Sequence, residues 1–340
     1  MKKISILFRT SGGKTRKGEL GFGHIYRCNN LAHQLSKSNI YFLIEDNGGA
    51  KEVLFDNGFK NIIVKKFTSI DADIKETRRI INENNIDIVV VDIYKVNSKY
   101  LNEIRKLTKT VVIADLKTKN LNGDLIVNGF IGFENQIAEN SYGARCLLGP
   151  KYQILNKKFS KKKITRKKEF KLLATFGAFD DYNLKNIFLD CLKKYIEFIP
   201  TKIILGPSTS KSKKMQKLEK TYPNLKIIEE STNMWKDITS AEFGICSGGL
   251  TTYEFAASGV PFAIMCQVKH QLVTAREWQR KNFAINLGLK NEKTQNKLEK
   301  YLENIVRKDL KIRTNNQIID GLGAHRVSEE IFRLKSRINT

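Results

Sequence analysis

One histidine lies in a glycine-rich segment whose spacing could bring it to a bound ligand. The segment reads Gly21-Phe22-Gly23-His24-Ile25-Tyr26-Arg27. An apolar stretch before it, residues 4–8, predicts a buried strand, and the residues after it, around Leu31 and Leu35, predict a helix. The start of such a helix offers backbone amides to an anion, and its positive end is expected to hold the imidazole of His24 neutral and able to act as a base. The alternative is that His24 only caps or packs.

Two common nucleotide motifs do not match this part of the chain. A dinucleotide fingerprint needs a third glycine where the chain has Tyr26, although Glu45 lies at a spacing that could suit a ribose. A P-loop would end in Gly13-Lys14-Thr15, but its upstream glycine would fall on Phe8, inside the predicted strand. The residue types at these motif positions therefore disfavour a nicotinamide cofactor and exclude a P-loop.

A second loop has the composition of an anion-binding turn. Ser247-Gly248-Gly249-Leu250 follows a predicted strand and opens a helix at Thr251, so that small residues meet free amides. A pyrophosphate would suit this loop, and Glu254 on the same helix could accept hydrogen bonds from a ribose. The alternative is a glycine-permitted turn with Glu254 in solvent. After the next predicted strand, His270 and Gln271 open another helix and could reach phosphate or sugar hydroxyls.

The composition indicates a globular protein. The chain has 340 residues, 41% of them hydrophobic, and its five cysteines form no C-x-x-C pair. We therefore expect reduced cysteines, and the four scattered histidines predict no metal cluster. No apolar run approaches the ~20 residues of a membrane span, so we expect no membrane insertion and a cytoplasmic location.

The net charge of +25 raises the question of an anionic partner. Lysines are spread through nearly every predicted helix rather than gathered in one segment. This distribution favours attraction of an anionic substrate or surface over a nucleic-acid partner. The densest basic run, residues 157–171, is expected to be a solvated linker.

Short apolar runs predict strands near residues 4, 41 and 62 and at residues 88–91, 111–113, 125–127, 172–176, 202–205, 225–228, 242–246 and 261–265. Helix-like segments alternate with them, which predicts parallel sheets with helices on both faces. We expect two Rossmann-like domains, residues 1–158 and 170–340, joined by a basic linker of residues 159–169 and facing a common cleft. Ligands of such sheets bind beyond the carboxyl ends of the strands. Those ends carry Asp92, Tyr94, Asp115 and residues 177–180. The helical spacing of residues 327–333 would also allow this segment to brace the first domain.

Together, the two loops resemble those of GT-B-type sugar-nucleotide enzymes. The first is similar to that of the UDP-2,4-diacetamido-2,4,6-trideoxy-beta-L-altropyranose hydrolases of pseudaminic acid biosynthesis, which carry G-x-G-H-x-x-R after their first strand. Further similar segments cover most of the chain: Asp92-Ile93-Tyr94, Gly149-Pro150-Lys151-Tyr152 with Phe159, residues 176–180 with Asn183, and Ser247 to Glu254, which the lipid II glycosyltransferase shares. Ala178 replaces a family glycine, Asp115 lacks acidic neighbours, and residues 12–20 lengthen the first loop.

The resemblance implies a fold, a reaction and a set of site residues. The reaction would be metal-independent and cofactor-free hydrolysis of a UDP-linked 2,4-diacetamido-2,4,6-trideoxy sugar, with inversion, releasing UDP and the free amino sugar for nonulosonic acid biosynthesis. His24 would be the general base. The implied substrate-binding residues are Gly21, Gly23, Arg27, Asp92, Tyr94, Tyr152, Gly177, Asp180, Gly248, Gly249, Leu250, Thr251, Glu254, His270 and Gln271.

Two other functions compete with this interpretation. A glycosyltransferase would use the same donor but direct an acceptor hydroxyl at the sugar, and its charge would help it dock on an anionic membrane. A nucleic-acid-binding protein would bind with a steep salt dependence that does not involve His24. The sequence leaves the oligomeric state open.

Overall fold

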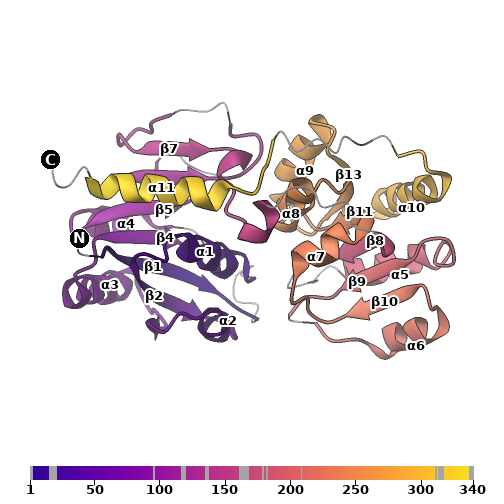
Figure 1. Ribbon diagram of the computed structural model, residues 1–340, viewed down its shortest axis with the longest axis horizontal. Coiled ribbons are helices and arrows are strands. Elements are labelled where there is room, and N and C mark those ends of the chain that lie inside the picture. The colour runs from indigo at the N-terminus through magenta and orange to yellow at the C-terminus, as the bar shows by residue number, and fades with distance from the viewer. Residues whose placement is uncertain are drawn as a thin grey trace. The chain divides into compact units, whose positions relative to one another are not determined.

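The structure is a computed structural model that describes residues 3–14, 21–94, 96–115, 120–134, 138–160, 168–177, 180, 183–207, 209–310, 312 and 318–336. The chain divides into two compact units, one of residues 1–157 and 321–340 and one of residues 158–320 (Figure 1). Each unit is an α/β domain built on one parallel sheet, which confirms the expected fold class. The expected common cleft remains a prediction.

The first unit has a seven-stranded sheet in the order β3-β2-β1-β4-β5-β6-β7. Its strands are β1 (Ser5–Gly12), β2 (Asn39–Asp46), β3 (Ile62–Val64), β4 (Ile88–Asp92), β5 (Lys109–Ile113), β6 (Leu125–Asn128) and β7 (Arg145–Leu148). Every neighbouring pair is parallel. The strand order reverses between β1 and β4, and such a switch point is where open α/β sheets bind ligands.

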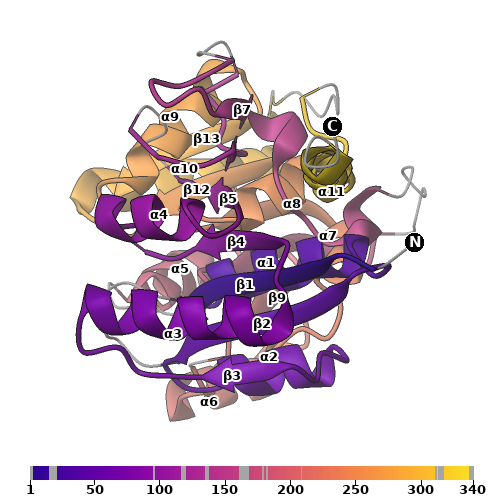
Figure 2. The ribbon, with the colours of Figure 1, turned by 90° about the vertical axis from the view of Figure 1, so that its left-hand side faces the viewer.

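Helices cover both faces of this sheet. They are α1 (Gly23–Gln34), α2 (Ala50–Asp56), α3 (Ile70–Asn84), α4 (Ser98–Arg105) and α11 (Gly323–Ser336), with short 3₁₀ turns η1 (Pro150–Tyr152) and η2 (Lys157–Ser160). Helix α3 packs beside α4, and α1 packs beside α2 and α11. Figure 2 shows α3 and α4 on the side of the sheet that faces the viewer. The apolar strands β4 and β5 are therefore buried, as expected for a parallel sheet.

The C-terminal helix α11 corrects the expected domain boundaries. Residues 321–340 belong to the first unit rather than to a continuous domain of residues 170–340. Gly323 packs so closely on Gln153 that a Cβ there would lie 2.2 Å from the Gln153 carbonyl oxygen. Arg326 donates to the carbonyl of Lys151 at 2.9 Å, and Arg145 pairs with Glu330 at 2.6 Å. These contacts join distant parts of the chain, which the helical spacing alone does not specify. Most of the expected linker, residues 161–167, lies outside the described residues.

The second unit has a six-stranded sheet in the order β10-β9-β8-β11-β12-β13. Its strands are β8 (Phe170–Thr175), β9 (Thr201–Ile204), β10 (Leu225–Ile228), β11 (Ala241–Cys246), β12 (Phe262–Cys266) and β13 (Ala284–Leu289). Its helices are α5 (Leu184–Leu192), α6 (Lys213–Thr221), α7 (Met234–Thr239), α8 (Thr251–Ser258), α9 (Gln271–Arg280) and α10 (Glu292–Arg307). Helix α7 packs beside α8, and α10 packs on α5. The strand order again reverses, between β8 and β11.

The apolar runs predicted the central strands of both sheets but missed β7 and β13. Strand β7 is only four residues long and begins with an exposed arginine. Strand β13 contains Asn286 and Gly288, and its register against β12 shifts next to Met265. Both strands lie at sheet edges, where hydrophobic patterning is weak. In the part of the chain that the structure describes, no helix combines the length and the apolar character needed to cross a membrane.

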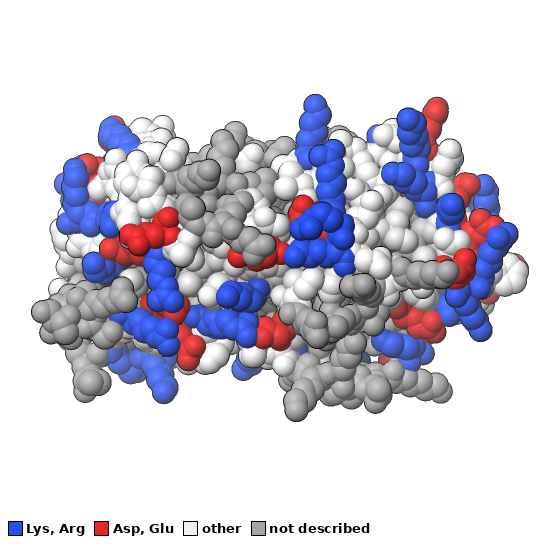
Figure 3. All heavy atoms as spheres, turned by 90° about the horizontal axis from the view of Figure 1, so that it is seen from above, with Lys and Arg blue, Asp and Glu red and all other residues white. Residues whose placement is uncertain are grey.

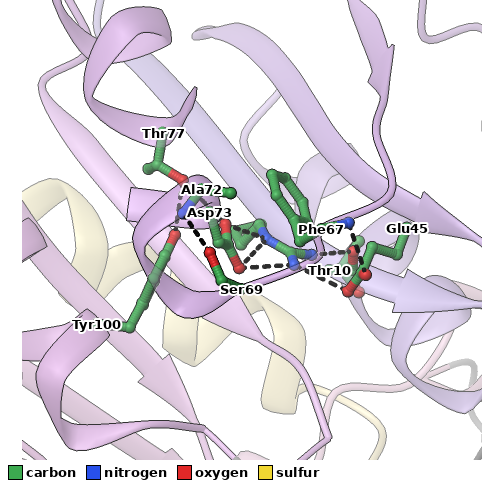
Figure 4. A network of polar contacts seen from close by, with 9 residues as sticks. Thr10, Glu45, Phe67, Ser69, Ala72, Asp73, Thr77 and Tyr100 are labelled. Carbon is green, nitrogen blue, oxygen red and sulfur yellow. Dashed lines mark hydrogen bonds and ion pairs between the residues drawn. The ribbon is translucent and has the colours of Figure 1, made fainter. Parts of the chain in front are cut away.

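A buried arginine ties three elements of the first unit together (Figure 4). Arg9 of β1 is 1% exposed, and its guanidinium donates to Asp73 of α3 at 2.8 Å and to Glu45 of β2 at 3.0 Å. The ring of Phe67 lies 4.6 Å from the guanidinium carbon. Because Glu45 already accepts from Arg9, its carboxylate is committed to the fold. The structure therefore gives no support to Glu45 as a ribose-binding residue.

The network predicts that Asp73→Asn destabilises the protein by about 3 kcal/mol, because it leaves a buried guanidinium with only the half-exposed Glu45 as counter-ion. Urea unfolding followed by circular dichroism measures the effect. Asp71→Asn is the matched control, since Asp71 lies on the same helix but pairs with Lys99 in solvent, where an ion pair contributes about 0–1 kcal/mol. Equal effects of the two substitutions would contradict the role assigned to Arg9.

Candidate functional site

His24 lies at the switch point of the first sheet. It is the second residue of α1, which begins directly after the loop that follows β1. Asp92 closes β4, the strand beside β1, and Asp115 follows β5, the next strand along. The carboxyl ends of these strands share one edge of the sheet, so residues up to 91 positions apart in the sequence meet there.

The imidazole of His24 and the carboxylate of Asp92 form a short hydrogen bond. The Nδ1 and Oδ1 atoms are 2.6 Å apart, and Asp92 is fully buried. Asp92 carries a negative charge and can only accept, so the proton between the two atoms belongs to Nδ1. In the neutral imidazole, the lone pair then lies on Nε2. The contact fixes both the ring orientation and the tautomer of His24.

Arg27, one turn further along α1, also binds the carboxylate of Asp92. Its Nε and Nη2 atoms donate to the two Asp92 oxygens at 2.8 and 2.6 Å, and its Nη1 donates to Asp115 at 2.8 Å. The thiol of Cys28 lies 3.5 Å from the same carboxylate. Burial alone would raise the pKa of Asp92, but the charges of Arg27 and His24 outweigh it and hold that pKa well below the usual range. Asp92 therefore stays ionised.

The structure adds two carboxylates to the expected environment of His24. Burial lowers the pKa of His24, but the neighbouring carboxylates of Asp92 and Asp115 outweigh burial and raise that pKa above the ordinary imidazole value. The prediction considered only the helix N-terminus and did not include a carboxylate in direct contact with Nδ1. The imidazole is consequently a stronger base than a free histidine, and it is protonated over a wider pH range.

The glycines around His24 leave room on its outer side. Gly23 is exposed, and a Cβ there would meet no atom within 4 Å. The half-buried Gly21 lies against Gly12, where a Cβ would be 2.8 Å from the Gly21 carbonyl oxygen. Close packing therefore explains Gly12, whereas the open space at Gly23 is compatible with the approach of a ligand. His24 itself keeps 14% of its side chain exposed.

The other expected site residues of the first unit lie near its surface. Tyr94 follows β4 and is 37% exposed. Tyr152 closes η1, and the ammonium of Lys151 lies 5.0 Å from its ring centre. Arg27 and Asp92, in contrast, are 6% and 0% exposed and bind each other. Their burial does not support the direct substrate contact that was expected for them. It supports a role in orienting His24 instead.

The Gly248-Gly249 turn of the second unit joins β11 to α8, as the sequence predicted. A Cβ at Gly248 would lie 2.7 Å from the Cβ of Gln271, so glycine is required there by packing. A Cβ at Gly249 would meet nothing within 4 Å. Among the described residues, no hydrogen bond is found for the amides of Gly249 and Leu250, at the N-terminus of the helix. They are available to an anion.

Gln271 has a structural task in this turn. Its Oε1 accepts from the amides of Gln267 at 2.8 Å and of Gly248 at 3.3 Å, which ties the start of α9 to the turn before α8. The carbonyl end of the Gln271 amide is therefore committed to the protein. His270, the residue before it, is exposed at the N-terminus of α9.

Glu254 is a partly buried carboxyl on α8, one turn beyond Thr251. Burial raises its pKa to about 7, and a hydrogen bond from Thr251 acts in the opposite direction. No lysine or arginine of the described ranges forms an ion pair with it. The residue thus differs from an ordinary solvated helix glutamate, and its carboxyl can exchange hydrogen bonds with a diol.

Gly177 lies shortly after β8, and Asp180 lies shortly before α5. The carboxylate of Asp180 accepts from the amides of Leu184 at 2.7 Å and Lys185 at 2.9 Å, so it caps the N-terminus of α5. Gly177 has a φ of +85°, a conformation that favours glycine. These contacts give both residues a local structural role. Ala178, which departs from the family pattern, lies outside the described residues.

Asp115 is the site residue that the sequence analysis did not select. It was recognised at a strand end, but its partner Arg27 is 88 positions away in the sequence.

Within the described ranges, no group of three or more His, Cys, Asp or Glu side chains could hold a metal ion. On the face in Figure 3, acidic side chains lie among the basic ones, so the positive charge there is interrupted.

Comparisons with known proteins agree with this architecture. Residues 160–331 match the glycosyltransferase family 28 C-terminal domain. The fold resembles that of MurG from Acinetobacter baumannii, with a TM-score of 0.67, 16% identity, and coverage of 97% of this chain and 99% of that one. This likeness confirms the expected GT-B type of fold.

Two relatives are similar over most of the chain. An uncharacterised protein of Methanocaldococcus jannaschii, MJ1062, is 28% identical over 73% of this chain, and the match spans 54% of that longer protein. The UDP-2,4-diacetamido-2,4,6-trideoxy-beta-L-altropyranose hydrolase of Campylobacter jejuni is 23% identical over 83% of this chain and 98% of its own length. The resemblance noted in the sequence is thus a distant homology. With half of its length matched by the family model, the chain belongs to the family that carries the glycosyltransferase family 28 C-terminal domain.

Proposed function

We propose that the protein hydrolyses a UDP-linked 2,4-diacetamido-2,4,6-trideoxy sugar and releases UDP and the free amino sugar. The observation that carries this proposal is the hydrogen bond between His24 and the buried Asp92, which makes a single histidine a basic group at a ligand-binding edge. The similarity to the Campylobacter hydrolase over nearly all of that protein's length supports the choice of substrate. The released sugar would then serve nonulosonic acid biosynthesis.

His24 is the general base of the proposed reaction. Its Nδ1–H stays on Asp92, and the Nε2 lone pair accepts a proton from water. The water oxygen forms a bond to the anomeric carbon as the bond from that carbon to the UDP oxygen breaks, with inversion. The electron pair of the broken bond leaves on UDP. A carboxylate that orients the imidazole also stabilises the imidazolium formed in this step.

The proposal places UDP on the second unit. The amides of Gly249 and Leu250 donate to the diphosphate and stabilise the charge that grows on it. Glu254, further along α8, accepts hydrogen bonds from the ribose diol, and Thr251 adds a hydroxyl. Gly248 and Gln271 keep the turn in this geometry. His270, exposed at the start of α9, is assigned to phosphate or sugar hydroxyls.

The remaining residues hold the sugar or shape its surroundings. Tyr94 contributes an exposed phenol ring and Tyr152 a half-buried one in the first unit, and Gly21 and Gly23 allow the sugar to approach His24. Arg27 and Asp92 orient the base instead of touching substrate. Asp180 caps the N-terminus of α5. No step of this scheme assigns a task to a metal or a cofactor.

A glycosyltransferase with a UDP-amino sugar donor is the second candidate. The match of residues 160–331 to a glycosyltransferase domain favours it specifically. The two candidates differ in the group that attacks the anomeric carbon, which is water in one and an acceptor hydroxyl in the other. Consumption of the donor without acceptor therefore separates them.

The first prediction concerns His24. The purified protein is mixed with the UDP-diacetamido-trideoxy sugar in ¹⁸O-water without acceptor and followed by NMR. We expect release of UDP and an ¹⁸O atom bound to the anomeric carbon of the sugar. His24→Gln should lower kcat by about 10²- to 10⁴-fold while UDP binding persists, because only the base is lost. His33→Gln, at an exposed position of the same helix, is the control. An intact donor would favour the transferase, and loss of UDP binding in His24→Gln would rule out the base assignment.

The pH dependence of kcat provides the second prediction. Only the neutral imidazole accepts a proton, and the folded protein raises the pKa of His24. As the pH decreases, kcat should therefore begin to fall at a higher pH than it would for a histidine with an ordinary pKa. Asp92→Asn removes the largest raising interaction and should move this limb to lower pH. The same substitution should lower kcat by about 10²-fold or more, because the tautomer is no longer fixed. An unchanged pH limb in Asp92→Asn would disprove the coupling.

The third prediction tests the nucleotide loop. Gly249→Val adds a side chain in open space, so the melting temperature should stay near that of the unsubstituted protein. The added isopropyl group should block the Gly249 and Leu250 amides and raise the KM for the nucleotide sugar and the Kd for UDP about 10- to 100-fold, the equivalent of one lost charge-assisted hydrogen bond. Calorimetry with UDP measures the Kd. Unchanged UDP binding would place the diphosphate elsewhere.

A further inference from the structure

We infer that Asp115 is a positioning residue that sets the proton affinity of His24 through Arg27. This inference deepens the proposed function, since it concerns the same base. Among the described residues, no hydrogen bond or ion pair joins Asp115 directly to His24. Its carboxylate accepts from Nη1 of Arg27 at 2.8 Å, and Nη2 of the same guanidinium lies 3.2 Å from Nδ1 of His24.

The charges of the cluster are balanced only when His24 carries a proton. Arg27 contributes one positive charge, and Asp92 and Asp115 contribute one negative charge each. With a neutral imidazole the four groups therefore carry one net negative charge, and protonation of His24 cancels it. Without the Asp115 charge the cluster would already be neutral, and protonation would create an excess positive charge at a mostly buried place, which is unfavourable.

Arg27 provides the link through which Asp115 affects the pKa of His24. A guanidinium next to an imidazole opposes protonation of the ring, and Arg27 acts on the pKa of His24 in this direction. Asp115 is the second carboxylate on that guanidinium and partly offsets its charge. Asp115 also acts to raise the pKa of His24, after the larger contribution of Asp92. In the described part of the chain, the largest charge contributions to the pKa of His24 come from Asp92 of β4, Asp115 after β5 and Arg27 of α1.

The two carboxylates differ in exposure, and this difference separates their tasks. Asp92 is fully buried, whereas 41% of the Asp115 side chain is exposed. Water and salt screen an exposed charge much more than a buried one. Asp92 thus fixes the tautomer and supplies most of the basicity, while Asp115 adjusts the basicity from the surface.

An NMR titration of the free protein tests the inference without any substrate. The four histidines are labelled with ¹³C and ¹⁵N, and the His24 signals are assigned by their loss in His24→Gln. Asp115→Asn should move the midpoint of the His24 titration to lower pH, because it removes the negative charge. The asparagine side chain keeps an oxygen that can accept a hydrogen bond from Arg27. Asp115→Glu keeps the charge and should leave the midpoint near that of the unsubstituted protein.

Asp56→Asn is the matched control, since it makes the same change of charge at an exposed position at the end of α2. It should leave the His24 midpoint unchanged. If Asp115→Asn and Asp56→Asn give the same midpoint as the unsubstituted protein, Asp115 does not act on His24 and the inference is overturned. An equal downward shift in both variants would also overturn it, because only the total charge would then matter.

The titration is independent of the reaction that the protein catalyses. If the nucleotide sugar is hydrolysed, the acid limb of the kcat profile should move in Asp115→Asn in the same direction as the NMR midpoint. If no hydrolysis is found but the midpoint shifts, the proposed function fails and the inference on Asp115 stands. If hydrolysis is found and the midpoint does not move, the inference alone fails.

Discussion

The ion pair between Arg27 and Asp92 is the interaction on which the candidate site depends. A buried carboxylate would normally take up a proton, and then it would lose the negative charge that raises the basicity of His24. The guanidinium prevents this by donating to both carboxylate oxygens, so Asp92 stays ionised in the interior. The cost of burying these charges is offset by several short hydrogen bonds. From this pair follow the orientation of the imidazole, its tautomer and its raised basicity.

The fold supplies this pair through the order of its strands. β1 and β4 are neighbours, so the helix that follows β1 begins beside the end of β4. Arg27 and His24 lie one turn apart on that helix and reach the same carboxylate from one side. A second buried arginine, Arg9, holds β1 against β2 and α3 through Asp73 and Glu45. The first unit thus uses one ion-pair network for its architecture and another for its candidate site.

The second unit has the same type of sheet, but the loop at its switch point is of a different kind. For the described residues 247–250 of its switch-point loop, no ion pair is found, and the loop brings small residues and free amides to the N-terminus of α8. Gly248 is needed because α9 packs against it, whereas Gly249 is open to the outside. The neighbouring Glu254 combines partial burial with a pKa of about 7. One unit therefore carries an imidazole of raised basicity, and the other carries free amides at a helix N-terminus.

The sequence by itself determined the local elements and the loops between them. The alternation of apolar strands and amphipathic helices, and the glycines before α1 and α8, result from interactions within a few residues, which patterning and turn chemistry reveal. The edge strands β7 and β13 were missed because their patterns are weak. Only the tertiary structure decided the contacts between distant residues: Asp92 at His24, Asp115 at Arg27, and α11 on the first unit. It also decided the raised pKa of His24, because a charge placed by folding, rather than the helix end adjacent in the sequence, dominates the environment of the ring.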